Sequence, residues 1–477
     1  MHGNEQKEKV KPKIKKTEMD LNDIKAVYFI GIGGIGMSAI ARYFLSRGTP
    51  VGGYDKTPSV LTERLKAEGA KVLYDDDPDE ISPEFKNPRN TLVVYTPAIP
   101  ADNKVLGFFR NMAYDVVKRA QVLGALTRAY RGLCVAGTHG KTTTSTMAAH
   151  IIQQSHVGCN AFLGGISKNY GTNYLLNSSS PYVVIEADEF DRSFHQLTPY
   201  ASVITAVDAD HLDIYGTLEA YIESFEKYTS LIRKGGALIM HKDIDLKPQL
   251  KDGVRFYDYG LDAGDFHAEN IRTGNGRIMF DLVSPFGNIA NIELGVPVYV
   301  NIENGVAAMA LAQIAGVSAD DIREGMRTFA GVERRFDIKI NTDKIVLISD
   351  YAHHPKEIEQ CINSVRKVFK GRKIAAIFQP HLYSRTRDFY KEFAKSLSLL
   401  DEVVLTEIYP ARERLIPGVT SRLIYDNLRP GIEKRLIRKE EVLDVVRSMD
   451  VDVLLILGAG DLDNMTPEIT KILLPRS

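Results

Sequence analysis

The amino-acid sequence predicts an α/β protein in which parallel strands alternate with helices. Short apolar runs recur along the chain, and most are continuous rather than alternating, which is typical of strands buried on both faces. Longer amphipathic stretches separate these runs, as expected for helical crossovers between parallel strands. The length of 477 residues fits about three domains of ordinary size.

The expected elements follow in chain order. The first strand lies in Ala26–Gly36, where an apolar run breaks into glycines, and a helix is expected over Met37–Ser46. Further strands are expected in Thr91–Tyr95, Gly132–Gly137, Tyr182–Asp188, Ala201–Val207, Ala237–Met240, Lys344–Tyr351, Lys373–Gln379, Val403–Tyr409 and Val451–Gly460. Further helices are expected in Thr142–Gln154, Leu218–Arg233 and Arg387–Leu400. Spaced glycines and polar alternation in Tyr257–Leu294 predict antiparallel strands.

The chain divides into four expected segments. Residues 1–20 hold the run KEKVKPKIKK and are expected to form a disordered basic tail. A dinucleotide-binding, Rossmann-like domain is expected over residues 21–128, and a central P-loop mononucleotide-binding α/β domain over residues 129–330. A third domain is expected over residues 331–477.

Composition and charge argue against a nucleic-acid-binding or membrane protein. Sixty basic and 61 acidic side chains give a formal net charge of −1, so no global field favours nucleic acid or an anionic membrane as a partner. No apolar run reaches the roughly 18–20 residues that cross a bilayer. Three scattered cysteines fit free thiols in a reducing compartment, which predicts a cytoplasmic protein.

The first glycine-rich turn follows the first expected strand and comprises Gly31, Gly33, Gly34, Ile35 and Gly36. Such a turn lets the backbone approach a pyrophosphate, which free N–H groups at the helix N-terminus then bind. Asp55 ends the next strand, where an acidic residue meets a ribose hydroxyl in dinucleotide-binding proteins. The pattern alone favours a nicotinamide or flavin dehydrogenase, while another nucleotide or a purely structural turn stays open.

The second loop comprises Gly137, Thr138, His139, Gly140, Lys141, Thr142 and Thr143. Its backbone N–H groups are expected to bind polyphosphate, with the Lys141 ammonium on the terminal phosphates and the Thr142 hydroxyl on Mg²⁺. Only Thr138 and His139 separate the two glycines, so the general P-loop spacing is not met. Gly-Lys-Thr after a buried strand still predicts an ATP or GTP site.

Acidic side chains follow the next two expected strands, in Glu186–Asp191 and Asp208–Asp213. Magnesium prefers hard oxygen ligands, and open α/β sheets bind ligands at the carboxyl ends of their strands. Glu189 and His211 are the best candidate metal ligands. Each run alone also fits a solvated acidic loop.

The last third of the chain carries basic groups at strand ends. His353 and His354 follow one expected strand, and His381, Arg385 and Arg387 follow the next. Arginine binds carboxylate or phosphate with two parallel hydrogen bonds, so this region is expected to receive an anion. Arg335 is expected either to contact phosphate or to form part of a surface pair with its neighbour.

Taken together, these motifs resemble those of the Mur ligase family. The resemblance rests on GIGGIGMSAIA (Gly31–Ala41), GTHGKTTT (Gly137–Thr144), EADEFDRSF (Glu186–Phe194), DADHLDIYG (Asp208–Gly216), VNIENGVAA (Val300–Ala308), DYAHHPKEI (Asp350–Ile358), FQPHLYSRT (Phe378–Thr386) and YPARE (Tyr409–Glu413). It covers essentially the whole chain after the tail. The shortened phosphate loop is the form that this family uses.

The resemblance implies an ATP-dependent amide ligase that forms an acyl phosphate and uses Mg²⁺. The first domain would bind UDP-N-acetylmuramate, the second ATP, and a Rossmann-like third domain the incoming L-alanine. The implied catalytic residues are Lys141, Glu189, His211 and Arg385, and the implied metal ligands are Thr142, Glu189 and His211. Asn304 would contact adenine, Asp350 its ribose and Arg335 a phosphate, while Tyr351, His353, His381 and Arg385 would line the amino-acid end.

Several alternatives stay open at this point. The double histidine of DYAHHP favours the alanine-adding member of the family, and the related murein tripeptide recycling ligase is the nearest competitor. From different classes, an NAD-linked oxidoreductase would bind nicotinamide at the first glycine turn, and a non-catalytic nucleotide-gated binding protein would hydrolyse nucleotide slowly whether or not an amino acid is present. A carbamylated lysine, with Lys227 in the right region, is a further open question. We expect a monomer or a weak homodimer.

Overall fold

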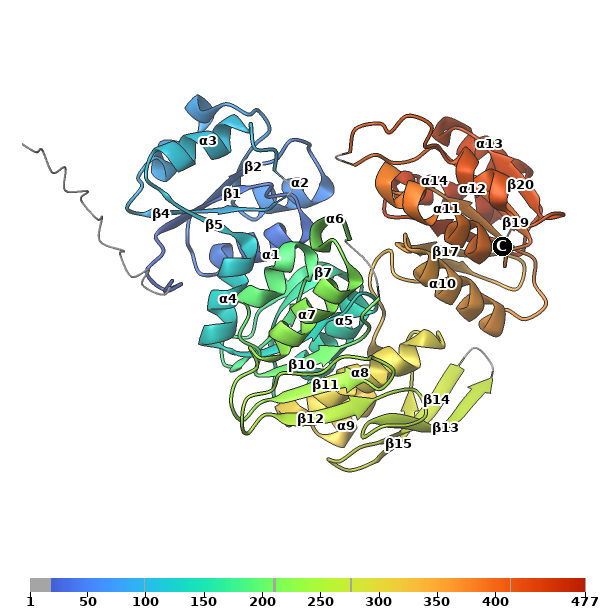
Figure 1. The fold of residues 1–477 in the computed structure, drawn as a ribbon, viewed down its shortest axis with the longest axis horizontal. Coiled ribbons are helices and arrows are strands. Elements are labelled where there is room, and N and C mark those ends of the chain that lie inside the picture. The colour runs from blue at the N-terminus through green and yellow to red at the C-terminus, as the bar shows by residue number, and fades with distance from the viewer. Residues whose placement is uncertain (1–18, 98, 209–211, 275–276, 412, 477) are drawn as a thin grey trace, which may run out of the picture.

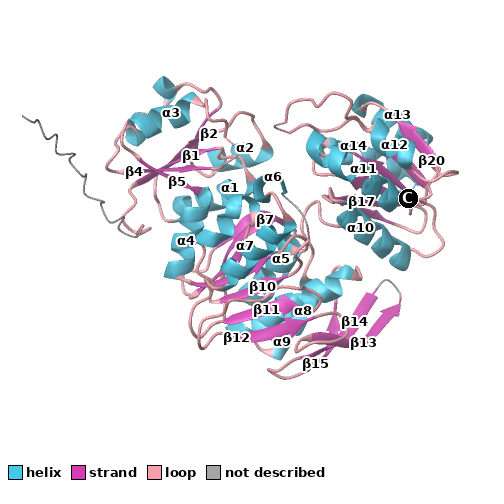
Figure 2. Ribbon diagram, viewed as in Figure 1, coloured by secondary structure: helices cyan, strands magenta, loops and turns pink. Residues whose placement is uncertain are grey.

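The computed structural model describes residues 19–476 apart from 98, 209–211, 275–276 and 412, and confirms the α/β class. Three mainly parallel sheets succeed one another along the chain, each flanked by helices, with a small antiparallel sheet attached to the second (Figures 1 and 2). Most of the expected tail, residues 1–18, lies outside the description, and so does His211.

The first sheet has five parallel strands in the order β3-β2-β1-β4-β5, the arrangement of a Rossmann-like half. The central strand β1 is fully buried, as its continuous apolar sequence predicted. Its strands are β1 (Ala26–Ile30), β2 (Val51–Tyr54), β3 (Lys71–Leu73), β4 (Thr91–Tyr95) and β5 (Asp115–Lys118). Its helices are α1 (Ile35–Ser46), α2 (Val60–Ala67), α3 (Lys104–Asn111) and α4 (Arg119–Ala129), with short 3₁₀ turns η1 (Pro78–Glu80) and η2 (Pro83–Phe85).

The second sheet has seven strands in the order β12-β11-β10-β6-β9-β7-β8, and only the edge strand β8 runs antiparallel. Its strands are β6 (Arg131–Ala136), β7 (Asn160–Ser167), β8 (Thr172–Leu175), β9 (Tyr182–Glu186), β10 (Ala201–Ile204), β11 (Ala237–His241) and β12 (Arg255–Tyr259). Its helices are α5 (Lys141–Gln153), η3 (Phe190–Gln196), α6 (Leu212–Tyr215), α7 (Leu218–Thr229), α8 (Val300–Ala315) and α9 (Ala319–Thr328).

The antiparallel sheet consists of β13 (His267–Gly274), β14 (Arg277–Val283) and β15 (Ile289–Glu293). Antiparallel strands were expected over Tyr257–Leu294, and this sheet fills most of that range. The expectation was wrong at its start, because β12 pairs in parallel with β11 and so belongs to the large sheet.

The third sheet has the order β16-β17-β21-β18-β19-β20, with β16 antiparallel at one edge. Its strands are β16 (Asp337–Asn341), β17 (Val346–Asp350), β18 (Ile374–Phe378), β19 (Glu402–Leu405), β20 (Glu433–Leu436) and β21 (Val453–Leu457). Its helices are α10 (Pro355–Val368), α11 (Tyr383–Leu397), α12 (Arg422–Asn427), η4 (Lys439–Glu441), α13 (Val442–Ser448), η5 (Leu462–Met465), α14 (Thr466–Leu473) and η6 (Leu474–Arg476).

The first two domains share one apolar core, in which Phe44 of α1 belongs to the same buried cluster as Phe162 and Tyr174 of the central domain. The third domain has two core clusters of its own, to which Val298, before α8, contributes one side chain. The first and third domains lie on either side of the same end of the central domain (Figure 1). The central domain is therefore the hub that each of the others contacts.

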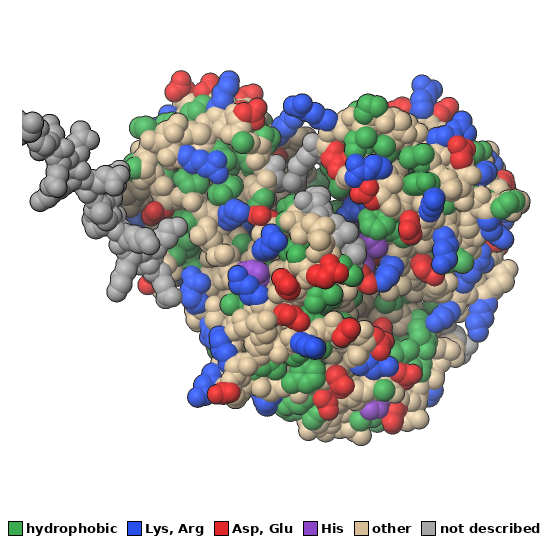
Figure 3. All heavy atoms as spheres, in the orientation of Figure 1, with side chains coloured by type: hydrophobic (Ala, Val, Ile, Leu, Met, Phe, Trp, Pro, Cys, Tyr) green, Lys and Arg blue, Asp and Glu red, His purple; other side chains and the backbone are tan. Residues whose placement is uncertain are grey.

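The surface carries charges of both signs, and Figure 3 shows acidic and basic side chains interspersed over the visible face. Within the described ranges, no helix combines the length and the apolar character needed to cross a bilayer. The three cysteines are buried free thiols.

Candidate active site

The first glycine-rich turn lies between β1 and α1, as predicted. Gly31 has φ +87°, which glycine adopts without strain, and its N–H donates to the Tyr54 carbonyl at 2.7 Å. The Gly33 N–H donates to Asp55 Oδ2 at 2.8 Å. Asp55, expected at a ribose hydroxyl, therefore contacts the turn itself in this structure.

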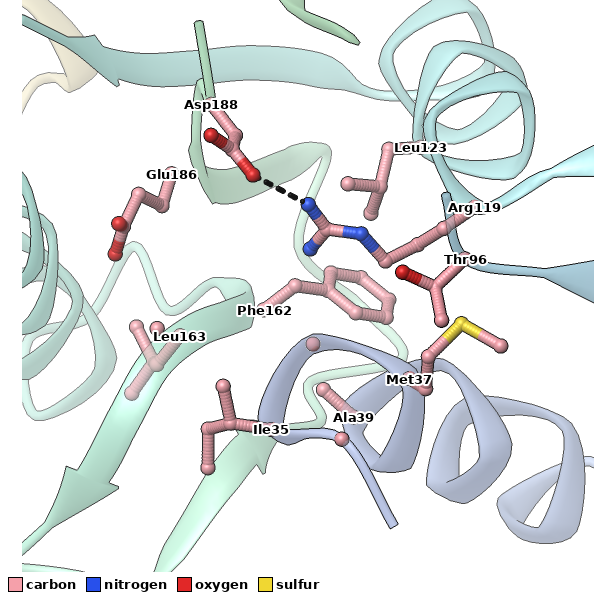
Figure 4. A pocket seen from close by; sticks show the side chains of 13 residues that line it. Ile35, Met37, Ala39, Thr96, Arg119, Leu123, Phe162, Leu163, Glu186 and Asp188 are labelled. Atoms are coloured by element: carbon pink, nitrogen blue, oxygen red, sulfur yellow. Dashed lines mark hydrogen bonds and ion pairs between the residues drawn. The ribbon is translucent and has the colours of Figure 1, made fainter. Parts of the chain in front are cut away.

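A pocket of about 290 Å³ opens beside this turn (Figure 4). It is lined by Gly34, Ile35, Gly36, Met37, Ala39, Thr96, Arg119, Leu123, Phe162, Leu163, Gly164, Glu186 and Asp188, so it lies between the first and the central domain. Residues of α1 form one side of the pocket, and Glu186 and Asp188 lie across from them (Figure 4).

Arg119, the first residue of α4, crosses this pocket and was not singled out from the sequence. Its Nη2 donates to Asp188 Oδ2 at 2.9 Å, which ties the first domain to the acidic run of the second (Figure 4). A Cβ atom on Gly36 would overlap the Arg119 guanidinium, so Gly36 leaves room for this side chain. The sequence feature that could have identified Arg119 is the pair Lys118-Arg119 at the end of β5.

The phosphate loop follows β6 and opens α5, as predicted. Gly137 and Gly140 have φ +128° and +79°, and a Cβ atom at Gly137 would overlap Thr205. Asn304, on α8, lies close to Gly140 and accepts a hydrogen bond from Thr144 at 3.2 Å. The loop is thus built from tightly packed backbone with its N–H groups at a helix N-terminus, which suits polyphosphate.

Lys141 extends over the loop toward the acidic run. Its Nζ lies 3.0 Å from Glu189 Oε1 and donates to the Gly137 carbonyl at 2.5 Å. Burial raises the pKa of Glu189 to about 7, and the nearby Lys141 ammonium opposes this rise. The Lys141 ammonium therefore lies against the backbone of the loop.

Thr142 contacts a different carboxylate from Lys141. Its Oγ1 donates to Glu186 Oε2 at 2.9 Å, and Arg335 Nη2 lies 3.5 Å from the same hydroxyl. A threonine hydroxyl beside a carboxylate is a donor set that fits Mg²⁺. The sequence interpretation ranked Glu189 above Glu186, and the signal that favours Glu186 is its place as the last residue of β9. Within the described residues, no three His, Cys, Asp or Glu side chains cluster as a metal cage.

Asp350 ends β17 and is partly buried against the segment that enters the third domain. It accepts hydrogen bonds from the backbone N–H groups of Phe336 at 2.9 Å and Ala352 at 2.7 Å. Burial raises its pKa to about 6, and Arg335 opposes the rise. The Tyr351 ring lies 4.8 Å from the guanidinium groups of both Arg334 and Arg335. The entry segment is therefore tied to the end of β17.

The residues that were expected to line the site of the amino-acid substrate come together at the ends of β17 and β18. The His353 and His381 rings lie 6.0 Å apart edge to face, and His381 Nδ1 is 3.5 Å from Arg385 Nη1. Burial lowers the pKa of His353 to about 4, with Arg385 adding to the effect. His353 is thus neutral at pH 7, and Arg385 is a nearby permanent cation.

Family models match three consecutive parts of the chain. They are described as the catalytic domain of the Mur ligase family (residues 26–131), the Mur ligase middle domain (135–312) and the Mur ligase glutamate ligase domain (334–460).

Curated relatives match over nearly the full length. The UDP-N-acetylmuramate–L-alanine ligase of Phocaeicola vulgatus is 66% identical over 95% of this chain and 99% of its own. The ligase of the same name from Porphyromonas gingivalis is 53% identical over 94% of this chain and 99% of its own.

Solved structures share the fold. The UDP-N-acetylmuramate–alanine ligase of Thermotoga maritima superposes with a TM-score of 0.79 at 29% identity, over 95% of this chain and all of that chain. A murein peptide ligase of Psychrobacter arcticus superposes with a TM-score of 0.68 at 20% identity, over 94% and 98% of the two chains.

Proposed function

Because this chain belongs to the Mur ligase family, we propose that it joins L-alanine to the lactyl carboxylate of UDP-N-acetylmuramate, with ATP converted to ADP and phosphate. The observation that carries the proposal is the shared pocket of Figure 4. It reaches from the first glycine turn to Glu186, which contacts Thr142 of the phosphate loop. An acid held by its nucleotide at the turn would therefore extend toward the bound ATP.

ATP is needed because a carboxylate and an ammonium ion do not condense in water. In the proposed reaction a carboxylate oxygen attacks the γ-phosphorus of ATP, the bond to ADP breaks, and an acyl phosphate forms. The alanine nitrogen, after losing a proton, attacks the acyl carbon, and the bond to phosphate breaks. Lys141 would neutralise negative charge on the transferred group, and the loop N–H groups would hold the phosphates.

We propose that Mg²⁺ is held by Thr142 and Glu186, with Glu189 and His211 as further ligands that the family resemblance implies. The hydrogen bond between Thr142 and Glu186 supports the first pair. Bound there, Mg²⁺ would neutralise charge on the phosphates of ATP. Asn304, close to the loop, and the partly buried Asp350 are the proposed contacts to adenine and ribose, and Arg335 is the proposed contact to a phosphate.

We propose that the third domain binds the L-alanine substrate. Arg385 is the proposed partner of the alanine carboxylate, because its planar fork matches a carboxylate. Tyr351, His353 and His381 would surround the rest of this small substrate. Since His353 is neutral at pH 7, it would not repel the alanine ammonium before proton loss. For the intact enzyme we propose a monomer or weak homodimer, and the three free thiols support a reducing, cytoplasmic location.

The test is a phosphate-release assay with purified protein, ATP and Mg²⁺. Release should require UDP-N-acetylmuramate and L-alanine together. A similar ligase from Neisseria is named for the tripeptide L-alanyl-γ-D-glutamyl-meso-diaminopimelate. This tripeptide should not replace alanine in the assay. Preference for the tripeptide would make the recycling reaction the correct one. Oxidation of NADH without phosphate release would instead favour an oxidoreductase, in which the phosphate loop has no role.

A Lys141→Ala variant provides the matched test of the loop. It should lose acyl-phosphate formation while still binding UDP-N-acetylmuramate in calorimetry, because the first glycine turn lies in another domain. Turnover comparable to that of the unmodified protein would contradict the role of Lys141.

A further inference from the structure

Two ion pairs cross from the phosphate loop region to the third domain, and neither was expected from the sequence. His139, in the loop, lies with Nδ1 3.3 Å from Glu357 Oε1 of α10. Lys356, the neighbour of Glu357, pairs with Asp208, which follows β10 in the central domain. His139 Nε2 is itself 3.4 Å from Asp208 Oδ2. We call these four side chains the crossed pairs, because each domain supplies one acid and one base and each acid pairs with a base of the other domain.

The crossed pairs join two parts of the proposed reaction that lie far apart in the sequence. His139 is two residues from Lys141, which would contact the transferred phosphate. Glu357 lies in the first turn of α10 and accepts hydrogen bonds from the backbone N–H groups of His353 at 3.0 Å and His354 at 3.2 Å. The carboxylate that meets the phosphate loop therefore also fixes the backbone of the alanine pocket.

Burial separates these contacts from ordinary surface pairs. The side chains of His139 and Glu357 are only 9% and 16% exposed, whereas many of the ion pairs on the surface leave both partners more than a third exposed. Nδ1 is within hydrogen-bond distance of Glu357, and Nε2 lies 3.4 Å from Asp208, so a carboxylate faces each ring nitrogen and favours the charged imidazole. Burial lowers the pKa of His139, but the two carboxylates of Asp208 and Glu357, which stabilise the charged ring, outweigh burial and raise this pKa to about 9. The ring is thus charged at neutral pH.

Resting on the function proposed above, we propose that the crossed pairs hold the third domain against the phosphate loop and thereby position the alanine pocket for attack on the acyl phosphate. Lys356 and Glu357 are positioning residues in this account, because they act through the placement of His353 and its neighbours. The Lys356–Asp208 pair suits this role, because its lysine is more than half exposed and the pair can separate into water and re-form at low cost.

The sharpest variant is Lys356→Glu, because Lys356 is 55% exposed and its replacement leaves no buried cavity. The new carboxylate would face Asp208 and repel it. The KM for L-alanine should rise about threefold to tenfold, since a partly exposed pair is reversed rather than merely removed. The KM values for ATP and UDP-N-acetylmuramate should change less than twofold. Lys370→Glu, the same charge change at an exposed site just beyond the end of α10, should leave all three unchanged.

Salt gives a readout that a general loss of structure would not produce. In the unmodified protein the KM for alanine should rise with ionic strength, because salt screens attraction. In Lys356→Glu it should fall with ionic strength, because salt then screens repulsion. Small-angle X-ray scattering without substrates should show a larger radius of gyration for Lys356→Glu than for Lys370→Glu.

The outcomes separate this inference from the proposed function. If the unmodified protein makes no alanine adduct, the function fails, and scattering still decides whether the crossed pairs hold the domains together. If the unmodified protein is active but Lys356→Glu shows the same KM for alanine, the same salt trend and the same radius of gyration as Lys370→Glu, the inference is overturned. A raised KM with a reversed salt trend supports it.

Discussion

Lys141 and Thr142 are adjacent in the chain, yet each contacts a different carboxylate. Lys141 pairs with Glu189, while Thr142 donates to Glu186. Which of the two acids reaches the proposed Mg²⁺ can therefore be tested with isosteric variants that keep the shape of each side chain.

Glu186→Gln should raise the Mg²⁺ concentration needed for half-maximal phosphate release by roughly tenfold or more, because an amide oxygen is a weaker ligand for a hard cation. Glu189→Gln should lower kcat with a smaller effect on the Mg²⁺ requirement, because Glu189 pairs with Lys141 in this structure, whereas Glu186 contacts the Thr142 hydroxyl. A magnesium titration of both variants measures the difference. The opposite ranking would return the metal site to Glu189, as the sequence favoured.

The residue types of the site could be predicted, but their pairings could not. Gly-Lys-Thr after a strand identified the phosphate loop. The choice between Glu186 and Glu189 depends on the turn after β9, where Asp191 and Arg192 both have positive φ. Neither residue is a glycine, so the sequence does not indicate this backbone conformation. His139 was expected only to bind phosphate, and its contact with Glu357 requires the third domain to be in place.

At the scale of elements, helix α1 is held by a side chain from another domain. Asn173 of β8 is fully buried, and its Nδ2 donates to the Ile35 carbonyl at 2.5 Å and to Ser38 Oγ at 3.0 Å. Its Oδ1 accepts from Arg42 Nη1 at 2.5 Å. The helix whose N-terminus faces the proposed pyrophosphate is thus fixed to the central sheet.

Asn173→Leu should lower the free energy of unfolding by about 1–3 kcal/mol, because it leaves buried polar groups of α1 without partners. The KM for UDP-N-acetylmuramate should rise while that for ATP stays constant. Urea unfolding and steady-state kinetics measure the two effects. Asn363→Leu, the same change on an exposed position of α10, is the control and should alter neither. A stable variant with an unchanged KM would show that α1 needs no such support.

Most strands that were predicted from the sequence have continuous apolar runs, such as β1, β4 and β21, while the antiparallel sheet was predicted from polar alternation. The hairpin of β7 and β8 was missed, because Gly164 and Gly165 interrupt its apolar pattern. A Cβ atom at Gly164 would overlap Glu186, so this glycine serves the site rather than the strand. β7 pairs in parallel with β9 and β8 packs on α1, contacts that come from the whole fold.

At the scale of the whole molecule, the two interfaces of the central domain differ in kind. The first domain shares an apolar core with it, whereas the third meets it through charged contacts such as Lys168–Asp337 at 2.9 Å and the crossed pairs. Apolar cores resist changes in pH, while ion pairs follow the titration of their members. The placement of the third domain should therefore be the pH-sensitive part of the structure.

The group that decides this sensitivity is His139, faced by Asp208 of the central domain and by His354, Lys356 and Glu357 of the third. Because its pKa is raised from about 6.5 to about 9, the stabilisation from its charge is fully present below about pH 6.5 and is lost as pH rises through about 9. The radius of gyration, measured by small-angle X-ray scattering, should therefore increase on going from pH 7 to pH 10. His139→Gln, whose amide does not titrate, should give a larger radius at pH 7 and little further change. An expansion of the same size in His139→Gln would assign the pH response to another group.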